Sequence, residues 1–331
     1  MGVGSMGAHE TKQWTWLHRK SFTHEQQALN CVKQEIMCAK KNLPLFTQLL
    51  FSWNALRPEN GYFTFYVQVR NQTTQKWSKW HKMMSWGATI QQSFTSESDQ
   101  FSSYHHVRLE TNKTLADAFA IKVKSEQDAD LSLLKSFTVN LANLNEFSHE
   151  DEKKLHTLPS LYVKDVPSIS QFTLKHPRND GLCSPTSCTM LASYLLCSKI
   201  DPLIFAEKSF DTGLDKYGSW PFNMAHAYEC GQQKVGFAVA RLSSFKNLYE
   251  QLKKSIPVAV SVRGYIKGAP RLYHNGHLLV VVGYDGKTKE VICHDPAASD
   301  TSLVKKRYSL KNFLNAWERS HRLAYLAQRI S

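Results

Sequence analysis

Two hydrophobic patterns divide the chain into an N-terminal and a C-terminal half. In the N-terminal half, residues 46–51, 61–70 and 118–123 alternate apolar and polar side chains or are rich in aromatic and β-branched residues, with turn signals between them. Short strands at this spacing predict a β-sandwich domain over residues 43–147. Before it lies an N-terminal segment, residues 1–42, in which apolar residues recur with helical spacing and predict a helix over residues 25–43.

The C-terminal half mixes helical and strand patterns. Helices are predicted over residues 184–197, 221–230 and 242–254, and strands over residues 235–240, 257–263, 277–284, 290–294 and 324–329. A charged and polar stretch, residues 148–158, predicts a linker between the two halves. The sequence therefore predicts an α+β fold in which a domain of residues 160–331 follows the β-sandwich.

The composition is that of a folded protein, with 42% hydrophobic and 21% charged residues. No stretch approaches the roughly 18 consecutive apolar residues that a membrane-spanning helix needs, and residues 1–19 lack the apolar core of a secretory signal. We therefore expect no membrane span and a cytoplasmic location, with non-standard secretion left open. The formal net charge of +13 favours acidic partners, but the basic residues occur in scattered pairs without interleaved aromatics, so no nucleic-acid partner is expected.

One of the seven cysteines is placed for nucleophilic chemistry. Cys183 follows a polar, turn-rich loop, and Ser184, Pro185 and Thr186 after it predict the start of a helix, with a hydroxyl group placed to cap it. At this end of a helix, the dipole and the free backbone N–H groups favour the thiolate, which is the nucleophilic form. Cys188 lies inside the same helix and is expected to pack. The cysteine spacings do not match the Cys-x-x-Cys pairs of structural zinc sites, so no metal is expected.

Two later segments supply a base and a carboxylate for this thiol. His277 begins a buried strand pattern, Asp295 follows the next one, and a turn around Gly286 separates them. Pairing that is symmetric about Gly286 would place His277 directly opposite Asp295, with Cβ atoms about 4.5–5.5 Å apart. A bulge that shifts this register by one residue would bring His294 forward and turn Asp295 away. A cysteine with a distant histidine and an aspartate is the set that thiol-based acyl transfer needs.

These motifs resemble those of papain-like cysteine peptidases related to the bacteriocin-processing (double-glycine leader) enzymes, in a stand-alone form. The resemblance covers about residues 160–328 and is carried by residues 166–171, 183–187, 276–277 and 295–296. It implies a papain-like fold with Cys183 as nucleophile, His277 as general base and acid, and Asp295 as the residue that orients the imidazole. It also implies that Gln171 donates its side-chain amide to the oxyanion, with Asn179 as a substitute because Gln171 lies further from the cysteine than is usual in the family.

The same resemblance suggests where a substrate is held. Residues 217–222 look like a loop of stand-alone relatives, where it walls the substrate cleft, although it could equally belong to the core. Tyr217, Gly218 and Trp220, together with Gly276 beside the histidine, are therefore candidate substrate-binding residues. The predicted reaction is hydrolysis of a peptide or protein substrate through a thioester, without a cofactor. Two alternatives remain open: an amidase or transferase with the same triad, and a catalytically degenerate binding protein.

Overall fold

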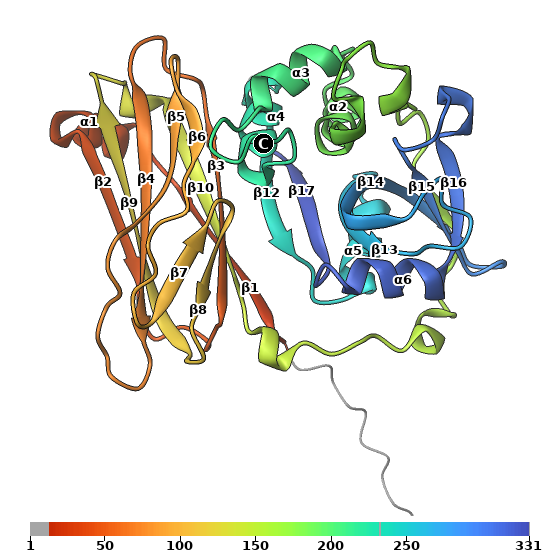
Figure 1. Ribbon diagram of the computed structural model, residues 1–331, viewed down its shortest axis with the longest axis horizontal. Coiled ribbons are helices and arrows are strands. Elements are labelled where there is room, and N and C mark those ends of the chain that lie inside the picture. Colours follow the sequence, from red (N-terminus) through yellow and green to blue (C-terminus); the bar gives the residue numbers. More distant parts are fainter. Residues whose placement is uncertain (1–12, 232, 331) are drawn as a thin grey trace, which may run out of the picture.

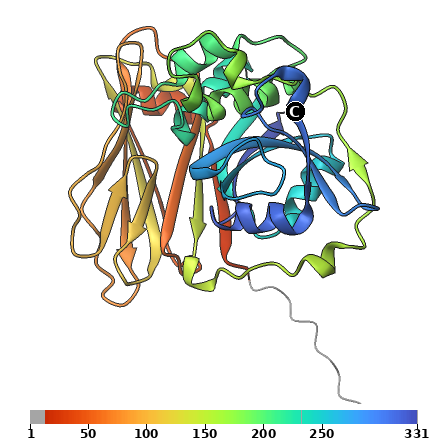
Figure 2. The same cartoon turned by 45° about the vertical axis from the view of Figure 1, so that its right-hand side comes forward.

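The computed structural model describes residues 13–231 and 233–330. The chain forms two units, which lie side by side in both views (Figure 1 and Figure 2). The N-terminal unit, red to yellow in Figure 1, is built from β-sheets, and the C-terminal unit, green to blue, combines helices and strands. Residues 1–12, on which most of the signal-sequence expectation rests, lie outside the described residues. No helix in the described part of the chain is long and apolar enough to cross a membrane.

The N-terminal unit contains two five-stranded antiparallel sheets. In spatial order, the first sheet consists of β1 (Thr15–Ser21), β10 (Leu134–Ala142), β3 (Gln48–Ala55), β8 (Arg108–Thr111) and β7 (Ser102–His105). The second sheet consists of β2 (Glu35–Lys40), β9 (Ala116–Glu126), β4 (Tyr62–Asn71), β5 (His81–Gly87) and β6 (Gln91–Ser93). Strands β1 and β2 precede residue 43, so the segment before that residue is hydrogen-bonded into both sheets.

Aromatic side chains fill the space between these two sheets. The ring of Phe65 on β4 lies 5.3 Å from that of Phe51 and 4.5 Å from that of Trp53, both on β3, and the apolar residues of both sheets form one buried cluster. Every residue of β3 is buried, because one face of the strand points into this cluster and the other is covered by the C-terminal unit.

The C-terminal unit has a seven-stranded antiparallel sheet with helices around it. Its strands follow the order β12 (Val235–Arg241), β17 (Leu323–Arg329), β13 (Val258–Gly264), β14 (Tyr273–Asp285), β15 (Glu290–His294) and β16 (Lys305–Ser309), with β11 (Leu161–Tyr162) paired to β14. The helices are α2 (Cys183–Leu196), α3 (Pro202–Ser209), α4 (Trp220–Cys230), α5 (Phe245–Lys253) and α6 (Leu310–Glu318).

Short 3-10 helices occur in both units and between them: η1 (Leu131–Leu133), η2 (Leu144–Glu146), η3 (Glu152–Leu155), η4 (Gln171–Thr173), η5 (Asn179–Gly181) and η6 (Thr301–Leu303).

The predicted elements of the C-terminal half are confirmed. The three predicted helices correspond to α2, α4 and α5, and the five predicted strands to β12, β13, β14, β15 and β17. The sequence pattern missed α3, α6, β11 and β16. The fold is thus α+β with antiparallel sheets, which is compatible with a papain-like domain.

The predicted helix over residues 25–43 is wrong in its second half. Helix α1 (His24–Lys33) starts at a capping box between Thr23 and Gln26, and it ends because Gln34 adopts a left-handed conformation with φ of 51°. The chain then continues as β2, whose residues pair with β9. The helical spacing of apolar residues was a poor guide to the length of this helix. Val32, one of these residues, is 84% exposed and therefore does not belong to a buried face.

The predicted linker, residues 148–158, lies against the C-terminal unit rather than free in solvent. Glu150 accepts a hydrogen bond from the backbone N–H of Phe245 at 2.7 Å, and Glu318 accepts one from the N–H of Glu150 at 2.8 Å. Leu155 is buried in the C-terminal core. In Figure 1 this yellow-green segment runs below the sheet from one unit to the far side of the other.

The two units meet along β12, which is an edge strand of the seven-stranded sheet. Three N–H groups of this strand donate to side chains of the N-terminal unit: Phe237 to Asn54 (2.8 Å), Val239 to Ser52 (3.1 Å) and Arg241 to Asn140 (2.9 Å). The cores also interpenetrate, since Phe222 and Ala225 of α4 belong to the N-terminal cluster. The N-terminal unit therefore covers an edge that would otherwise present unpaired backbone groups.

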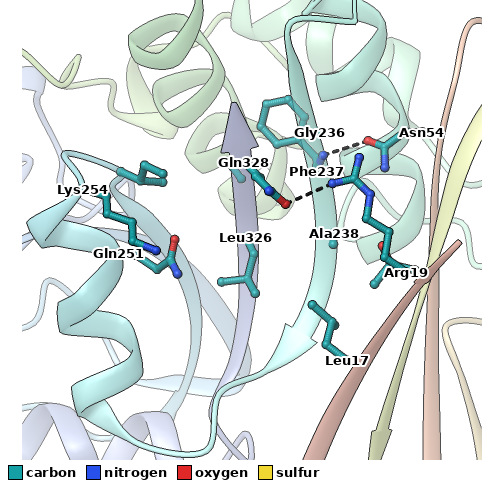
Figure 3. Close-up of a pocket in the computed structure, with 13 residues that line it drawn as sticks. Leu17, Arg19, Asn54, Gly236, Phe237, Ala238, Gln251, Lys254, Leu326 and Gln328 are labelled. Atoms are coloured by element: carbon teal, nitrogen blue, oxygen red, sulfur yellow. Dashed lines mark hydrogen bonds between the residues drawn. The ribbon is translucent and has the colours of Figure 1, made fainter. Parts of the chain in front are cut away.

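A cavity of about 320 Å³ lies at one end of this contact (Figure 3). It is lined by β1, by the start of β12 and by the end of β17. Arg19 donates to the side chain of Gln328 across it at 3.1 Å, which ties β1 to β17. The opposite ends of β12 and β17 lie near the site described next.

Candidate active site

Cys183 is the first residue of α2, one position earlier than predicted. The residue before it, Leu182, offers no side-chain cap, so the N–H groups of the first helical turn lack a capping partner. Ser184, predicted to cap, instead bonds the hydroxyl of Tyr325 at 2.9 Å. Ser187 donates to the backbone oxygen of Leu278 on β14 at 3.0 Å, which fixes the start of α2 against that strand. The helix thereby presents Cys183, a residue of intermediate exposure, at its positive end.

His277 and Asp295 form a buried pair beside this thiol. Nε2 of His277 lies 2.7 Å from Oδ1 of Asp295, and the two side chains are 5% and 0% exposed. The other side of the imidazole makes hydrogen-bonding and charge interactions with Cys183. The structure thus brings together the three residues that the sequence singled out.

The strand register behind this contact differs from the predicted one. Symmetric pairing about Gly286 would place Val280 opposite Ile292, whereas Val280 pairs with His294 and the register shifts between Val281 and Gly283. A bulge is therefore present, but at Val280 the register differs from the symmetric one by two residues rather than by the one considered as an alternative. Asp295 does not turn away, because β15 ends at His294, the chain turns, and the carboxylate that follows reaches the imidazole. His294 itself bonds the backbone oxygen of Pro167 at 2.9 Å.

Two tyrosines that the sequence analysis did not single out complete the surroundings of Asp295. The hydroxyl groups of Tyr273 and Tyr308 donate to Oδ2 at 2.6 and 2.7 Å, and the N–H of Ala297 donates to Oδ1 at 3.0 Å. The Tyr273 ring also stacks on the His277 ring, with centroids 4.1 Å apart and an angle of 9° between the planes. Tyr273 lies four residues before His277 and could have been suspected; Tyr308 is on β16, which no pattern predicted.

These contacts shift the protonation of all three groups. Burial alone would raise the pKa of the Cys183 thiol, but hydrogen bonding and charge from His277, with the N–H groups of Leu278 and Ser184, lower it overall. Burial opposes a charged imidazole, yet the charge and hydrogen bond of Asp295 raise the pKa of His277 to about 9. The pKa of Asp295 is lowered against the effect of burial, chiefly by His277. The site therefore favours a thiolate beside an imidazolium.

Gln171 is close in sequence to the site but does not direct a free donor. Its side chain is buried, and Nε2 donates to the backbone oxygens of Asn179 at 2.8 Å and of Asp180 at 3.0 Å. Both amide hydrogens are thus used to hold η5, the turn that precedes α2. An oxyanion role for Gln171 would require these bonds to break, and that role, like the substitute role of Asn179, stays a prediction.

The predicted substrate-binding residues fall into two groups. Tyr217 is buried against Phe210, and its hydroxyl bonds His176 at 3.2 Å, so it packs rather than lines a cavity. Gly218 faces open space. Trp220 and Gly276, in contrast, line a common cavity of about 330 Å³. Gly276 has φ of +93°, which favours glycine immediately before His277.

A comparison with protein families bears on this arrangement. Residues 163–325 match the Peptidase_C39 like family. This match supports a C39-type cysteine-peptidase-like domain over these residues. The match includes Cys183, His277 and Asp295, and it supports a peptidase of the cysteine type. A search of curated proteins finds no match.

The other cysteines of the C39-like domain are placed differently. Burial raises the pKa of Cys188 and Cys293 well above the usual value. Cys230 lies 3.6 Å from Nε2 of His226, whose Nδ1 lies 2.9 Å from Glu229, so a cysteine, a histidine and a carboxylate meet a second time. Here, however, burial and the charge of Glu229 raise the pKa of Cys230 to about 11. Among the described residues, no cluster of three or more His, Cys, Asp or Glu side chains is arranged to hold a metal ion.

Proposed function

We propose that the protein is a cysteine peptidase that hydrolyses peptide bonds through Cys183, His277 and Asp295. The observation that carries the proposal is the buried His277–Asp295 pair at 2.7 Å, which faces a thiol at the N-terminus of α2. The family match supports the reaction class, since it covers all three residues.

In the proposed reaction, the Cys183 thiolate attacks the carbonyl carbon of the scissile bond and an oxyanion forms. The backbone N–H of Cys183, at the start of α2, is the donor expected to stabilise this charge. The His277 imidazolium gives its proton to the leaving amine, and a thioester with Cys183 remains. His277, now neutral, takes a proton from water, the hydroxide adds to the thioester, and the carboxylic acid leaves as the thiolate is restored.

Asp295 acts on this cycle through His277. Its carboxylate fixes the ring so that Nδ1 faces the sulfur, and its charge stabilises the imidazolium. The three donors from Tyr273, Tyr308 and Ala297 keep the carboxylate ionised and oriented although it is fully buried.

We also propose that the N-terminal unit is a β-sandwich accessory domain that begins near β1. The single aromatic core between its two sheets supports this assignment. A cytoplasmic location is likewise proposed, because a thiol with a lowered pKa is best preserved in a reducing compartment.

The full chain is incubated with a peptide library derived from a cell lysate, and the products are identified by mass spectrometry. New peptide termini are expected with the wild type and not with Cys183→Ala. Cys197→Ala, which removes an exposed cysteine, is the matched control and should retain activity. Ligated or amine-exchanged products without new free carboxylates would favour a transferase. The absence of any product, with intact folding, would contradict enzymatic function.

A further inference from the structure

The cavity next to His277 is lined by both units. It has a volume of about 330 Å³ and lies where β12 and β13 end and β14 begins. Trp220 and Gly276 belong to the C-terminal unit, whereas Gln48 and Arg108 come from strands β3 and β8 of the N-terminal unit. Gly276 directly precedes His277 on β14, so the cavity lies one residue along the strand from the proposed catalytic histidine, which does not itself line it.

Positive charge dominates the cavity lining. Four arginines line it, Arg108, Arg241, Arg263 and Arg319, and we call it the arginine cavity. The carboxylate among its lining residues is Glu110, which pairs with Arg108 at 2.7 Å. Among the described residues, no ion pair is formed by the other three arginines. A surplus of positive charge therefore faces an open space.

Arg241 shows that this charge is only partly balanced from within the protein. The side chain is 6% exposed, and its guanidinium donates only to neutral acceptors: Gln48 Oε1 at 2.8 Å and the backbone oxygens of Ser320 and His321 at 2.6 and 2.8 Å. Burial and the nearby charge of Arg108 lower the pKa of Arg241 to about 9, although the charge of Glu110 opposes them. A buried charge with no directly bonded counter-charge is costly, so an anion in the cavity would stabilise it.

Two further arginines could hold such an anion by their guanidinium groups. Arg263 and Arg319 are exposed at the cavity, and Arg263 uses Nε for the backbone oxygen of His274 at 3.2 Å. The Arg319 guanidinium lies against Gly264, where a Cβ atom would come within 2.1 Å of its nitrogen. Planar guanidinium groups match the two oxygens of a carboxylate, which favours this anion in a site that receives peptides.

The position relative to His277 indicates which part of a substrate reaches the cavity. The imidazolium must protonate the leaving amine, so the departing part of the peptide passes along the His277 side of the site. We propose that the arginine cavity binds a carboxylate on the leaving-group side of the scissile bond, an inference that rests on the peptidase function proposed above. That carboxylate is either the C-terminus of the peptide or an acidic side chain. The N-terminal unit would then contribute directly to substrate recognition.

Four pools of N-acetylated random octapeptides test this proposal and distinguish the two sources. The pools end in a carboxylate or a carboxamide, and they contain or lack Asp and Glu in the last four positions. With the wild-type full chain, binding of the peptide C-terminus predicts faster cleavage of the two pools that end in a carboxylate, and binding of an acidic side chain predicts faster cleavage of the two pools that contain Asp and Glu. In either case we expect about tenfold faster cleavage than for the pool with a carboxamide end and no Asp or Glu, because charge-assisted hydrogen bonds are worth at least this factor. Equal rates for all four pools would overturn the proposal and leave the peptidase function standing.

The variant Arg263→Gln/Arg319→Gln should lose the preference for carboxylate pools. Arg329→Gln is the matched control, since Arg329 is exposed at the opposite end of β17, and it should keep the preference. A preference that survives in the double variant would contradict the assignment. If the wild type cleaves no pool, retention is measured on immobilised Cys183→Ser chain. Carboxylate-selective retention that the double variant loses would support carboxylate binding in the arginine cavity and contradict the peptidase function. Unselective retention would contradict carboxylate binding in the cavity as well.

Discussion

A cysteine, a histidine and an acidic residue come together at two places among the described residues, but only one of these arrangements favours a thiolate. Cys183 begins α2, whereas Cys230 is the last residue of α4, although each contacts a histidine that is paired with an acidic residue. A helix dipole stabilises negative charge at its N-terminus and opposes it at its C-terminus. The pKa is accordingly lowered for Cys183 and raised to about 11 for Cys230.

We expect iodoacetamide to alkylate Cys183 faster than Cys230 between pH 6 and 8, because only the thiolate reacts. Peptide mapping of the intact protein after short exposure measures both rates in one sample, with Cys230 as the internal control. Faster labelling of Cys230, or equal rates for the two cysteines, would contradict the assignment of Cys183 as nucleophile.

The protonation of His277 sets the alkaline limit of activity. With a pKa of about 9, it can protonate the leaving amine up to that pH, so kcat/KM should fall as pH rises through about 9. The pKa lies above the unperturbed value of 6.5, so the charge interaction with Asp295 should stabilise the fold fully below pH 6.5. That stabilisation is lost as pH rises through about 9. Asp295→Asn should move the alkaline limit of residual activity to lower pH; an unmoved limit would show that the carboxylate does not hold the proton.

Removing one hydroxyl group should reduce the stabilisation of the buried Asp295 carboxylate. Tyr308→Phe deletes a 2.7 Å hydrogen bond to Asp295, and we expect the free energy of unfolding to fall by about 1–3 kcal/mol. Tyr284→Phe is the matched control, because its buried hydroxyl has no hydrogen-bond partner. Urea unfolding of both variants compares them, and equal losses would argue that packing, rather than the bond to Asp295, determines the effect.

At the scale of elements, the positions of helices and strands could be predicted from the sequence where the buried residues form a regular apolar pattern. Strands β12 to β15 and helices α2, α4 and α5 are buried along continuous apolar patterns, so their positions could be predicted. Helix α1 and strand β2 could not be separated, because the boundary depends on one left-handed residue, Gln34, and on pairing with β9, which is distant in sequence.

The contact between His277 and Asp295 was predicted for an incorrect geometric reason. The predicted hairpin placed them opposite each other within a regular ladder, whereas β15 ends one residue before Asp295. The residues of the site could be predicted because chemistry limits the choice of base and carboxylate. The partners Tyr273 and Tyr308 could not, since they depend on how β14, β15 and β16 assemble.

The start of β14 depends on a backbone conformation that alanine adopts only with strain. Gly276→Ala should lower the free energy of unfolding by about 1–2 kcal/mol and reduce activity, because φ is +93° although no atom lies closer than 3.9 Å to the added Cβ. Gly218→Ala, where a Cβ meets nothing within 4 Å, is the matched control and should be tolerated. Thermal unfolding and peptidase assays on both variants test this, and a neutral Gly276→Ala would contradict it.

At the scale of the whole molecule, we expect contacts with the N-terminal unit to stabilise the C39-like domain. Asn54→Ala removes the acceptor of the Phe237 N–H on β12, and we expect a loss of about 1–3 kcal/mol together with one shared unfolding transition. Asn315→Ala, on the exposed side of α6, is the matched control and should change little. Calorimetry that resolves two transitions, with only the N-terminal one shifted by Asn54→Ala, would show that the units unfold independently.

The way the N-terminal unit completes β12 also bears on how such proteins diversify. A catalytic domain whose edge strand is satisfied by three side chains of its neighbour cannot readily be recombined with an unrelated partner. Exchange of the N-terminal unit would leave backbone groups unpaired and open one wall of the arginine cavity. We therefore expect the two halves to be inherited together, with change concentrated in loops away from β12.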